Sequence, residues 1–184
     1  MLARWDGMPE IIDNFLSEDV FLPIQKVLMG AYFPWYYNNC TTFADDDKRY
    51  LTLNKTTDIF DYQFIHSFYH LEQGVGVISR FEVIEPIIKK LDCFCLLRAK
   101  ANLKTLYSGP QDKQKNNYHR DFDKDCTTAI LYINTNNGYT IFKDTKQKID
   151  CVANRLVKFN SKLEHDGISS NDSKQRVVIN FNYI

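Results

Sequence analysis

The second half of the chain, from Cys93 onward, is built from short runs rich in β-branched and aromatic residues. The runs are CFCLLRAKANL, TTAILYIN, GYTIF, LVKFN and RVVINFNYI, and each has the composition of a β-strand. Polar turn sequences such as SGPQDKQKNN, NTNNG and SSNDSKQ separate these runs from one another. Several short strands at this spacing predict an all-β sandwich or a jelly roll.

The first helix is predicted near the N-terminus of the chain. The segment IIDNFLSEDVFLPIQKVLMG reads as a short strand or entry segment followed by a helix, with Ser17 as the N-cap. Apolar residues then recur at helical spacing from Phe21 to Leu28. Residues 30–57 show no clear period, and we expect irregular structure or short strands there.

Two further helices are expected before the strands begin. Residues 58–74 (DIFDYQFIHSFYHLEQG) predict a second helix that ends near Gly74. Residues 79–82 (SRFE) form a capping box that opens a third helix, which runs to about Leu91. Pro86 lies inside this third helix and is expected to kink it or to shift its start.

Together these patterns predict one α+β domain, mainly β, that spans residues 1–184. Its catalytic core would be a double-stranded β-helix, or jelly roll, over about residues 93–184. Residues 1–92 would form a helical N-terminal support whose helices brace one outer face of this core. A length of 184 residues fits a single domain with a sizeable interior.

Composition excludes several classes of partner. Lys plus Arg and Asp plus Glu both number 23, so no overall attraction to nucleic acid or to a membrane is indicated. No stretch approaches the ~18 apolar residues of a membrane span, and the N-terminal residues do not resemble a signal peptide. The 5 cysteines form no C-x-x-C pair, which indicates reduced thiols and a cytoplasmic location.

The tripeptide His119-Arg120-Asp121 is the strongest candidate for chemistry. Side chains alternate along a strand, so His119 and Asp121 would project from one face and chelate one cation. His165 follows 46 residues after His119, in a turn-like stretch at a strand end, and supplies a third ligand. Two imidazoles and one carboxylate form the ligand set of a facial Fe(II) site with open positions.

The same residues allow alternatives to an Fe(II) site. Imidazole also binds Zn, Cu and Ni, so the ligand types alone do not fix the metal. Asp123 and Asp125 continue the alternation, but they lie further from the first histidine. His66 and His70 are four residues apart, but no neighbouring acid completes a set, so we expect surface or packing roles. An ordinary polar role at strand ends is the competing interpretation of the tripeptide and its partner histidine.

A candidate carboxylate receptor lies 11 residues after the second histidine. Alternation along RVVINFNYI places Arg176, Val178, Asn180 and Asn182 on one face, which suits the lining of a ligand cavity. An arginine in a cavity must be paired, and the distal carboxylate of a dicarboxylate would pair with it bidentately. A protein carboxylate is the alternative partner.

Three further residues are candidates for the same cavity. Tyr132 in the run TTAILYIN would offer a phenol hydroxyl to the same carboxylate, with a core aromatic as the alternative. Thr140 and Asn102 are expected to face the cavity as well.

These residues resemble a known family. The motifs are H-R-D (119–121), LYIN, NNGYTIF (136–142), NRLVKFNSKLEH (154–165) and Arg176. Over roughly residues 98–184 the chain is similar to the Fe(II)/2-oxoglutarate-dependent dioxygenases, specifically to the small prolyl 4-hydroxylase-like branch. Uncharacterised members of this kind occur in bacteriophage genomes, and the sequence is similar to those, which suggests action in a bacterial host cytoplasm.

The resemblance implies a function and its cofactors. It implies Fe(II) on His119, Asp121 and His165, with the C5 carboxylate of 2-oxoglutarate on Arg176 and Tyr132. It further implies a jelly roll, O2 as co-substrate, ascorbate-type assistance, and hydroxylation of a C–H bond in a prolyl or other protein side chain.

The chain departs from the family pattern at two places. A turn with Asn137-Gly138 stands where the family often has Gly-Gly. The family often has a tyrosine on the strand before H-x-D. That segment here reads KANLKTLY, so Asn102, Lys104 or Tyr107 would take the place of this tyrosine.

Two rival functions follow from the same motifs. One is a cupin-like metalloprotein that acts without a keto acid, and the other is a catalytically inactive binding module. The substrate itself stays open among a peptide or protein, a small molecule and a nucleobase. The polar loop 108–118 is expected to be either a mobile lid or a plain hairpin turn.

Overall fold

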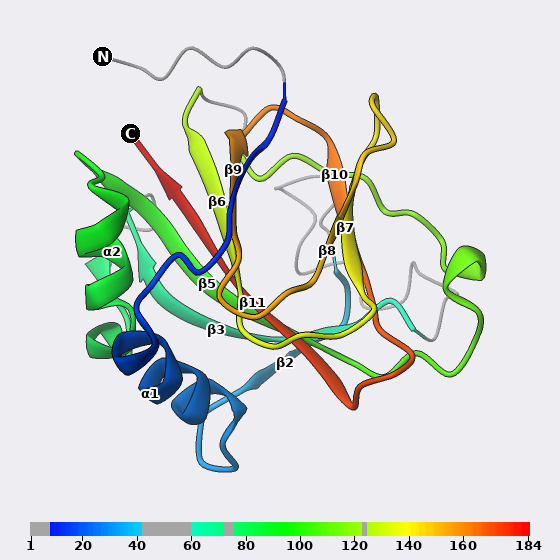
Figure 1. Ribbon diagram of the computed structural model, residues 1–184, viewed down its shortest axis with the longest axis horizontal. Helices are drawn as coiled ribbons and strands as arrows, with labels where there is room; N and C mark the ends of the chain where they lie inside the picture. Colours follow the sequence, from blue (N-terminus) through cyan, green and yellow to red (C-terminus); the bar gives the residue numbers. More distant parts are fainter. Residues whose placement is uncertain (1–7, 42–59, 72–75, 123–124) are drawn as a thin grey trace.

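The computed structural model describes residues 8–41, 60–71, 76–122 and 125–184. Two antiparallel β-sheets form most of the molecule, and two α-helices pack against one of them (Figure 1). The order of strands is β1-β9-β6-β11-β5-β3-β2 in the large sheet, with β4 on β3, and β10-β7-β8 in the small sheet. The predicted class, mainly β with helices on one outer face, is therefore confirmed.

The strands of the large sheet are β1 (Glu10–Ile12), β2 (Tyr36–Asn38), β3 (Gln63–His70), β4 (Gly76–Val77), β5 (Leu96–Thr105), β6 (Thr127–Tyr132), β9 (Leu156–Asn160) and β11 (Gln175–Tyr183). Those of the small sheet are β7 (Tyr139–Phe142), β8 (Lys148–Asp150) and β10 (His165–Ile168). The helices are α1 (Glu18–Met29), α2 (Glu85–Leu91) and two 3-10 turns, η2 (Phe81–Val83) and η3 (Gln111–Lys113).

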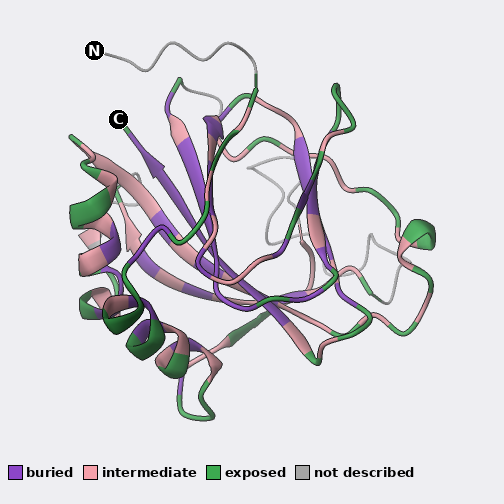
Figure 2. Ribbon diagram, in the orientation of Figure 1, coloured by how far each residue is buried: buried purple, intermediate pink, exposed green. Residues whose placement is uncertain are grey.

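The main hydrophobic core lies between the helices and the outer face of the large sheet. Phe21 and Leu28 of α1 and Ile87 of α2 are buried there. Alternate residues of β11, beginning with Val177, and of β5, beginning with Ala99, face this core. Figure 2 shows the pattern, with buried ribbon toward the sheet and exposed ribbon on the outer side of both helices.

A second, smaller apolar cluster lies between the two sheets. It contains Ile130 and Tyr132 of β6, Phe142 of β7, Phe159 of β9 and Val178 of β11. The strands β6 and β11 therefore bury both faces, one against the helices and one against the small sheet. The face toward the small sheet, which we call the inner face, carries the candidate site.

Helix α1 begins where the sequence predicts. Ser17 has an extended backbone, and its carbonyl oxygen accepts hydrogen bonds from the N–H groups of Val20 and Phe21. Its side chain makes no capping hydrogen bond, so the start of the helix depends on the backbone and on burial of its apolar stripe. No helix in the described residues is long and apolar enough to cross a membrane.

The second predicted helix is wrong, because residues 63–70 form strand β3. This strand pairs with β5 on one side and with β2 and β4 on the other. The run QFIHSFYH has aromatic and β-branched residues that satisfy both a helical and a strand period, and pairing within the sheet decides between them. Four strands of the large sheet, β1 to β4, thus come from residues 1–92, which were predicted to be a mainly helical support.

The two histidines of this segment therefore lie on a strand and not on the predicted helix, and His66 has the packing role that was expected. His66 is fully buried, its ring packs against Phe33 and Phe68, and its Nδ1 lies 2.8 Å from the carbonyl oxygen of Pro34. It is a packing residue on the helix side of the sheet. His70 is partly buried at the end of the strand, four residues further on.

The third helix ends at Leu91, as predicted, but it starts later than the capping box implies. Arg80 takes a left-handed backbone conformation with φ of 54°, a single 3-10 turn follows, and α2 begins at Glu85. Pro86 then lies in the first turn of α2, where the missing N–H of proline has no helical partner to lose. The proline shifts the start of the helix and does not kink it.

Candidate metal centre and carboxylate site

His119 and His165 are held together by their own backbones. The N–H of each donates to the carbonyl oxygen of the other at 3.0 Å, so the two residues form an antiparallel bridge. His165 is the first residue of β10, and not part of a turn as the sequence suggested. His119 belongs to no regular strand, so this single bridge, and not a strand, sets the direction of its side chain.

Asp121 completes a compact group of ligands. One ligand atom from each of His119, Asp121 and His165 lies within 4.8 Å of the other two. Asp121 Oδ2 is 3.6 Å from His165 Nε2, is buried, and has no hydrogen-bond partner among the described residues. A buried carboxylate oxygen without a donor is costly unless a cation compensates it, so the geometry fits a metal ion.

The imidazole rings present the same nitrogen to this group. Nδ1 of His119 lies 3.2 Å from the carbonyl oxygen of Asn117, and Nδ1 of His165 lies 3.0 Å from that of Leu163. A carbonyl oxygen only accepts, so in the neutral form of each ring Nδ1 carries the proton and Nε2 keeps the lone pair. Backbone acceptors that fix the histidine tautomer in this way are typical of metal sites.

Arg98 of β5 anchors the carboxylate and was missed by the sequence analysis. Its Nη2 donates to Asp121 Oδ1 at 2.9 Å, and its Nε donates to Asn182 Oδ1 at 2.9 Å. One oxygen of Asp121 is thereby fixed, and the other is left to face the two histidines. The alternation of Arg98 with Ala99 along β5 was the available signal, because it places the arginine on the inner face.

The protonation states favour metal binding. Burial alone would raise the pKa of the Asp121 carboxyl, but the charges of His165, Arg98 and His119 hold this pKa below its usual range. Burial, and next the neighbouring His165, lower the pKa of His119. The group therefore offers an ionised carboxylate and a neutral imidazole, which are the forms that bind metal ions.

The competing acids do not join this group. Asp125 is exposed and accepts hydrogen bonds from Lys162 at 2.8 Å and from Asn160 at 3.1 Å. Asp123 lies outside the described residues. Within the described ranges, His119, Asp121 and His165 are the set of His, Cys, Asp and Glu residues with metal-binding geometry.

Arg176 lies on the same inner face, next to Tyr132 and Thr140. It is 4% exposed, its Nη2 donates to Thr140 Oγ1 at 3.2 Å, and its guanidinium lies 5.7 Å from the centre of the Tyr132 ring. The Tyr132 hydroxyl also donates to Thr140 Oγ1, at 2.7 Å. Thr140 thus accepts twice, and its own hydroxyl proton is left for a further acceptor.

The Arg176 guanidinium has capacity for a ligand. Its Nε is buried without a hydrogen-bond partner, and no carboxylate among the described residues forms an ion pair with it. In the described part of the chain, therefore, no protein carboxylate pairs with this arginine, contrary to the alternative interpretation. Burial raises the pKa of the neighbouring Tyr132 to about 12, so its hydroxyl keeps its proton.

Glycine makes room for this arginine. A Cβ atom on Gly167 would lie 3.2 Å from Arg176 Nη1, and one on Gly138 would lie 2.8 Å from Arg176 Cδ. Both positions are thus packed against the arginine side chain, from β10 and from the start of β7. Gly138 belongs to the Asn-Gly turn that the sequence marked as a departure from the usual Gly-Gly.

Three residues were predicted to replace the tyrosine that the family often has on the strand before H-x-D, and they lie at different places. Lys104 is the cross-strand partner of Arg176, and its Nζ donates to the carbonyl oxygen of Gly167. Asn102 lies two residues away on the same face, with a buried Oδ1 that has no hydrogen-bond partner. Tyr107 follows the end of β5 and packs against the ring of Phe60.

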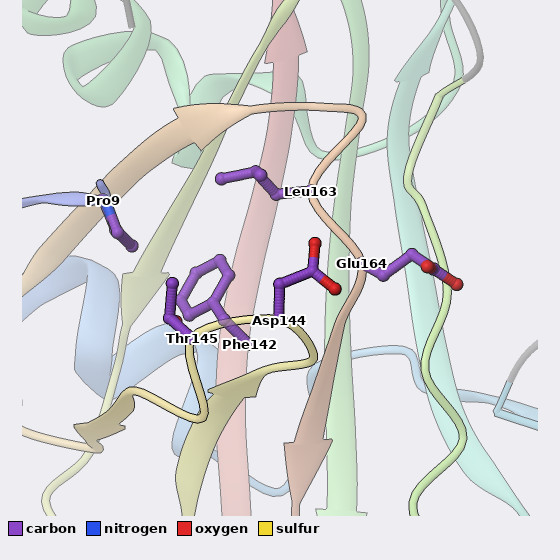
Figure 3. A pocket seen from close by; sticks show the side chains of 6 residues that line it. All are labelled: Pro9, Phe142, Asp144, Thr145, Leu163 and Glu164. Carbon is purple, nitrogen blue, oxygen red and sulfur yellow. The ribbon is translucent and has the colours of Figure 1, made fainter. Parts of the chain in front are cut away.

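A polar pocket adjoins both parts of the site. Its volume is about 190 Å³, and its walls include Thr41, Asp61, Lys104, Asn117 and Asp166. Asn117 precedes His119 by two residues and Asp166 follows His165, so the pocket borders the elements that carry the histidines. A second depression, between Phe142, Leu163 and Glu164 (Figure 3), has a volume of only about 10 Å³, which is too small for a ligand beyond a single water.

The loop 108–118 is fastened to the turn after β10. Gln114 Nε2 donates to the carbonyl oxygen of Ser169, and the N–H of Ser169 donates to Gln114 Oε1, both at 3.0 Å. Gln111 Nε2 donates to the carbonyl oxygens of Ser169 and Asn137. The loop is therefore more than a hairpin turn, since it forms one wall of the pocket beside the site.

No protein-family model and no curated protein sequence matches the chain. Solved structures do match it. The viral collagen prolyl hydroxylase of Paramecium bursaria Chlorella virus-1, in complex with 2OG, is 18% identical, with a TM-score of 0.56 over 98% of this chain and 97% of that one. A prolyl hydroxylase of Trichoplax adhaerens, bound to a peptide of hypoxia inducible factor, is 18% identical, with a TM-score of 0.59 over 97% and 84%.

An oxidoreductase of the 2OG-Fe(II) oxygenase family from Burkholderia pseudomallei is 8% identical and has a TM-score of 0.62, covering 95% of this chain and 84% of that one. The chain thus has the fold of these proteins over nearly its whole length, and the predicted jelly roll is confirmed.

Proposed function

We propose that this protein is an Fe(II)- and 2-oxoglutarate-dependent dioxygenase that hydroxylates a C–H bond. The observation that carries the proposal is a pair of sites on one inner face. A group of two histidines and one aspartate fits a metal ion, and the buried Arg176 of β11, which has no carboxylate partner in the described part of the chain, lies against Gly167 of β10. The fold shared with 2OG-Fe(II) oxygenases supports it.

In this proposal each residue has a defined task. His119, Asp121 and His165 hold Fe(II), and their arrangement leaves coordination positions for 2-oxoglutarate and O2. When bound, the iron supplies O2 activation coupled to the oxidative decarboxylation of 2-oxoglutarate to succinate and CO2.

The protein's other residues position the co-substrate. Arg176 pairs with the distal carboxylate, and the Thr140 hydroxyl donates its remaining hydrogen bond to the same group. Tyr132 orients Thr140 and packs under the guanidinium, and Asn102 completes this wall. Arg98 keeps Asp121 in its ligating orientation.

The resemblance to prolyl hydroxylases favours a prolyl or other protein side chain as the substrate. A prolyl hydroxylase with this fold is bound to a peptide in its solved structure. The single-domain organisation over residues 1–184, a cytoplasmic location, phage origin and ascorbate assistance remain predictions from the sequence. All the cysteines are unpaired, in keeping with the cytoplasmic expectation.

The test is Fe(II)-dependent turnover of 2-oxoglutarate. Anaerobic addition of Fe(II) and 2-oxoglutarate to the purified protein should produce a weak visible absorption band, and admission of O2 should release succinate. Asp121→Ala should abolish both signals, while Asp125→Ala, which alters an exposed acid outside the metal group, should leave them unchanged. A band-free protein that still binds Fe(II) would instead indicate the cupin-like alternative, and absence of metal binding would indicate an inactive binding module.

A further inference from the structure

The inner face of β5 carries more positive charge than the proposed co-substrate requires. Ala99, Ala101 and Leu103 face the core beneath the helices, so Arg98, Lys100, Asn102 and Lys104 point to the other side. Each is the cross-strand partner of an inner-face residue of β11. Arg98 opposes Asn182, Lys100 opposes Asn180, and Lys104 opposes Arg176.

Three of the four inner-face cations have a defined partner. Arg98 is bound to Asp121 and Asn182. Lys104 donates to a backbone carbonyl, and the charges of Asp166 and Asp61 partly offset the lowering of its pKa by burial. Arg176 lies against Thr140 and Tyr132, with its Nε reserved for the distal carboxylate of 2-oxoglutarate.

Lys100 is the remaining cation. Among the described residues, its ammonium group forms no hydrogen bond or ion pair with any acceptor. Burial first, and Arg98 next, lower the pKa of Lys100 to about 8, so the amine is still mostly protonated at neutral pH. The nearby Asp121 carboxylate offsets part of this lowering, but that carboxylate is bound to Arg98 and faces His165, so the partly buried amine has no carboxylate of its own among the described residues. A carboxylate on a bound ligand would supply one.

Two buried amide oxygens lie beside this lysine. Asn180 is its cross-strand partner and Asn102 follows it by two residues. The Oδ1 atoms of both are buried, and no donor from the described segments reaches them. Asn180 is 8% exposed. The dianion of 2-oxoglutarate has only acceptor oxygens, so it satisfies neither amide oxygen. A bound molecule with an N–H or O–H group would satisfy both.

We propose that the substrate carries a carboxylate that binds Lys100, with an adjacent N–H group that donates to Asn180 or Asn102. This proposal rests on the proposed function and names the substrate class for that same site. The chemistry is that of an amino acid, either free or as an acidic residue within a peptide. Lys100 is then a specificity-determining residue that binds the substrate next to the metal-bound end of 2-oxoglutarate.

The test compares matched probes that differ in one charge. The pairs are acetyl-aspartate amide with acetyl-asparagine amide, acetyl-glutamate amide with acetyl-glutamine amide, and L-proline with L-prolinamide. The first two pairs represent an acidic residue in a peptide, and the third represents a free amino acid. Binding is measured anaerobically as a shift of the visible band of the Fe(II)–2-oxoglutarate complex, and turnover as extra succinate after O2 is admitted.

The carboxylate-bearing member of at least one pair should bind about tenfold or more tightly than its carboxamide partner, since a charge-assisted hydrogen bond is stronger than a neutral one. Lys100→Met should reduce that preference to within about threefold, and Lys100→Arg should keep most of it. Lys89→Met, at an exposed lysine of α2, is the matched control and should behave like the wild type.

The failures are distinguishable. A wild-type protein with no visible band contradicts the proposed function itself. The role of Lys100 alone is overturned if the band and the basal succinate release are normal but no carboxylate-bearing probe has an effect. It is also overturned if both members of every pair have equal effects. An undiminished preference in Lys100→Met overturns it as well.

Discussion

Arg98 fixes the orientation of a carboxylate in the candidate metal site without being a candidate ligand itself. It holds one oxygen of Asp121 at 2.9 Å and leaves the other toward His165. The Asp121 side chain is only 4% exposed, so loss of the arginine leaves a buried charge uncompensated until a metal ion binds. The arginine therefore has two effects, on the stability of the metal-free protein and on the orientation of the ligand.

We expect Arg98→Met to weaken Fe(II) binding about 10–100-fold, which is the usual consequence of losing a group that orients a metal ligand. The same substitution should lower the free energy of unfolding more in the metal-free protein than in the metal-loaded one. Urea unfolding with and without Mn(II), alongside a metal titration, measures both quantities. Equal destabilisation in the two states would mean that the arginine acts only through general packing.

Gly167 connects strand β10 to the arginine site. A methyl group at this position would lie 3.2 Å from Arg176 Nη1, so Gly167→Ala should displace the guanidinium and raise the KM for 2-oxoglutarate. Overpacking of this kind costs roughly 1–3 kcal/mol, which corresponds to about 5- to 150-fold in affinity. Steady-state kinetics with a parallel metal titration checks this, because the affinity for Fe(II) should stay unchanged. A fall in metal affinity of similar size would show instead that β10 itself has shifted.

At the scale of the element, α1 stabilises the sheet from outside without reaching the site. Leu28 is fully buried against the outer face, whereas Leu22 on the same helix is 52% exposed. Leu28→Ala should lower the free energy of unfolding by about 2–5 kcal/mol, and Leu22→Ala by less than about 0.5 kcal/mol. Chemical denaturation of both variants measures this. The KM for 2-oxoglutarate should stay at the wild-type value in both, and a change in the Leu28 variant would show that the helix influences the inner face.

Sequence periodicity predicted the elements that have one apolar face. It failed where the apolar residues fit both the helical and the strand period. The alternation along β11 placed Arg176 and Val177 on opposite faces, and the structure agrees. Residues 63–70 fit a helix by spacing, but they pair between two strands, and this pairing is a non-local interaction that no local pattern contains.

The same limit explains the parts of the site that the sequence did not reveal. His119, Asp121 and His165 were found because H-x-D and a later histidine are a chemical pattern, although a single backbone bridge, and not a strand, brings them together. Arg98 and Lys100 were missed because their roles depend on the register of β5 against β11. That register is set by the whole sheet.

At the scale of the whole molecule, the site joins elements that are far apart in the chain. The large sheet contributes Arg98 and Arg176, and the small sheet contributes Thr140 and His165. Ligands that contact both sheets should therefore stabilise the entire fold and not one element alone. In the proposed site 2-oxoglutarate would bind both the metal ion and Arg176, so metal binding should precede the stabilisation by 2-oxoglutarate.

Thermal unfolding tests this order of binding. At a concentration 100-fold above its Kd, a ligand adds about 2.7 kcal/mol, which for a domain of this size raises Tm by roughly 5–10 °C. Mn(II) alone should raise Tm, and 2-oxoglutarate should raise it further only when the metal is present. In Arg176→Met the shift from the metal should persist while the further shift is lost, and in Asp121→Ala both should disappear. A 2-oxoglutarate shift that survives removal of the metal by a chelator would place its binding site away from the histidines and would contradict the joint site proposed for the two sheets.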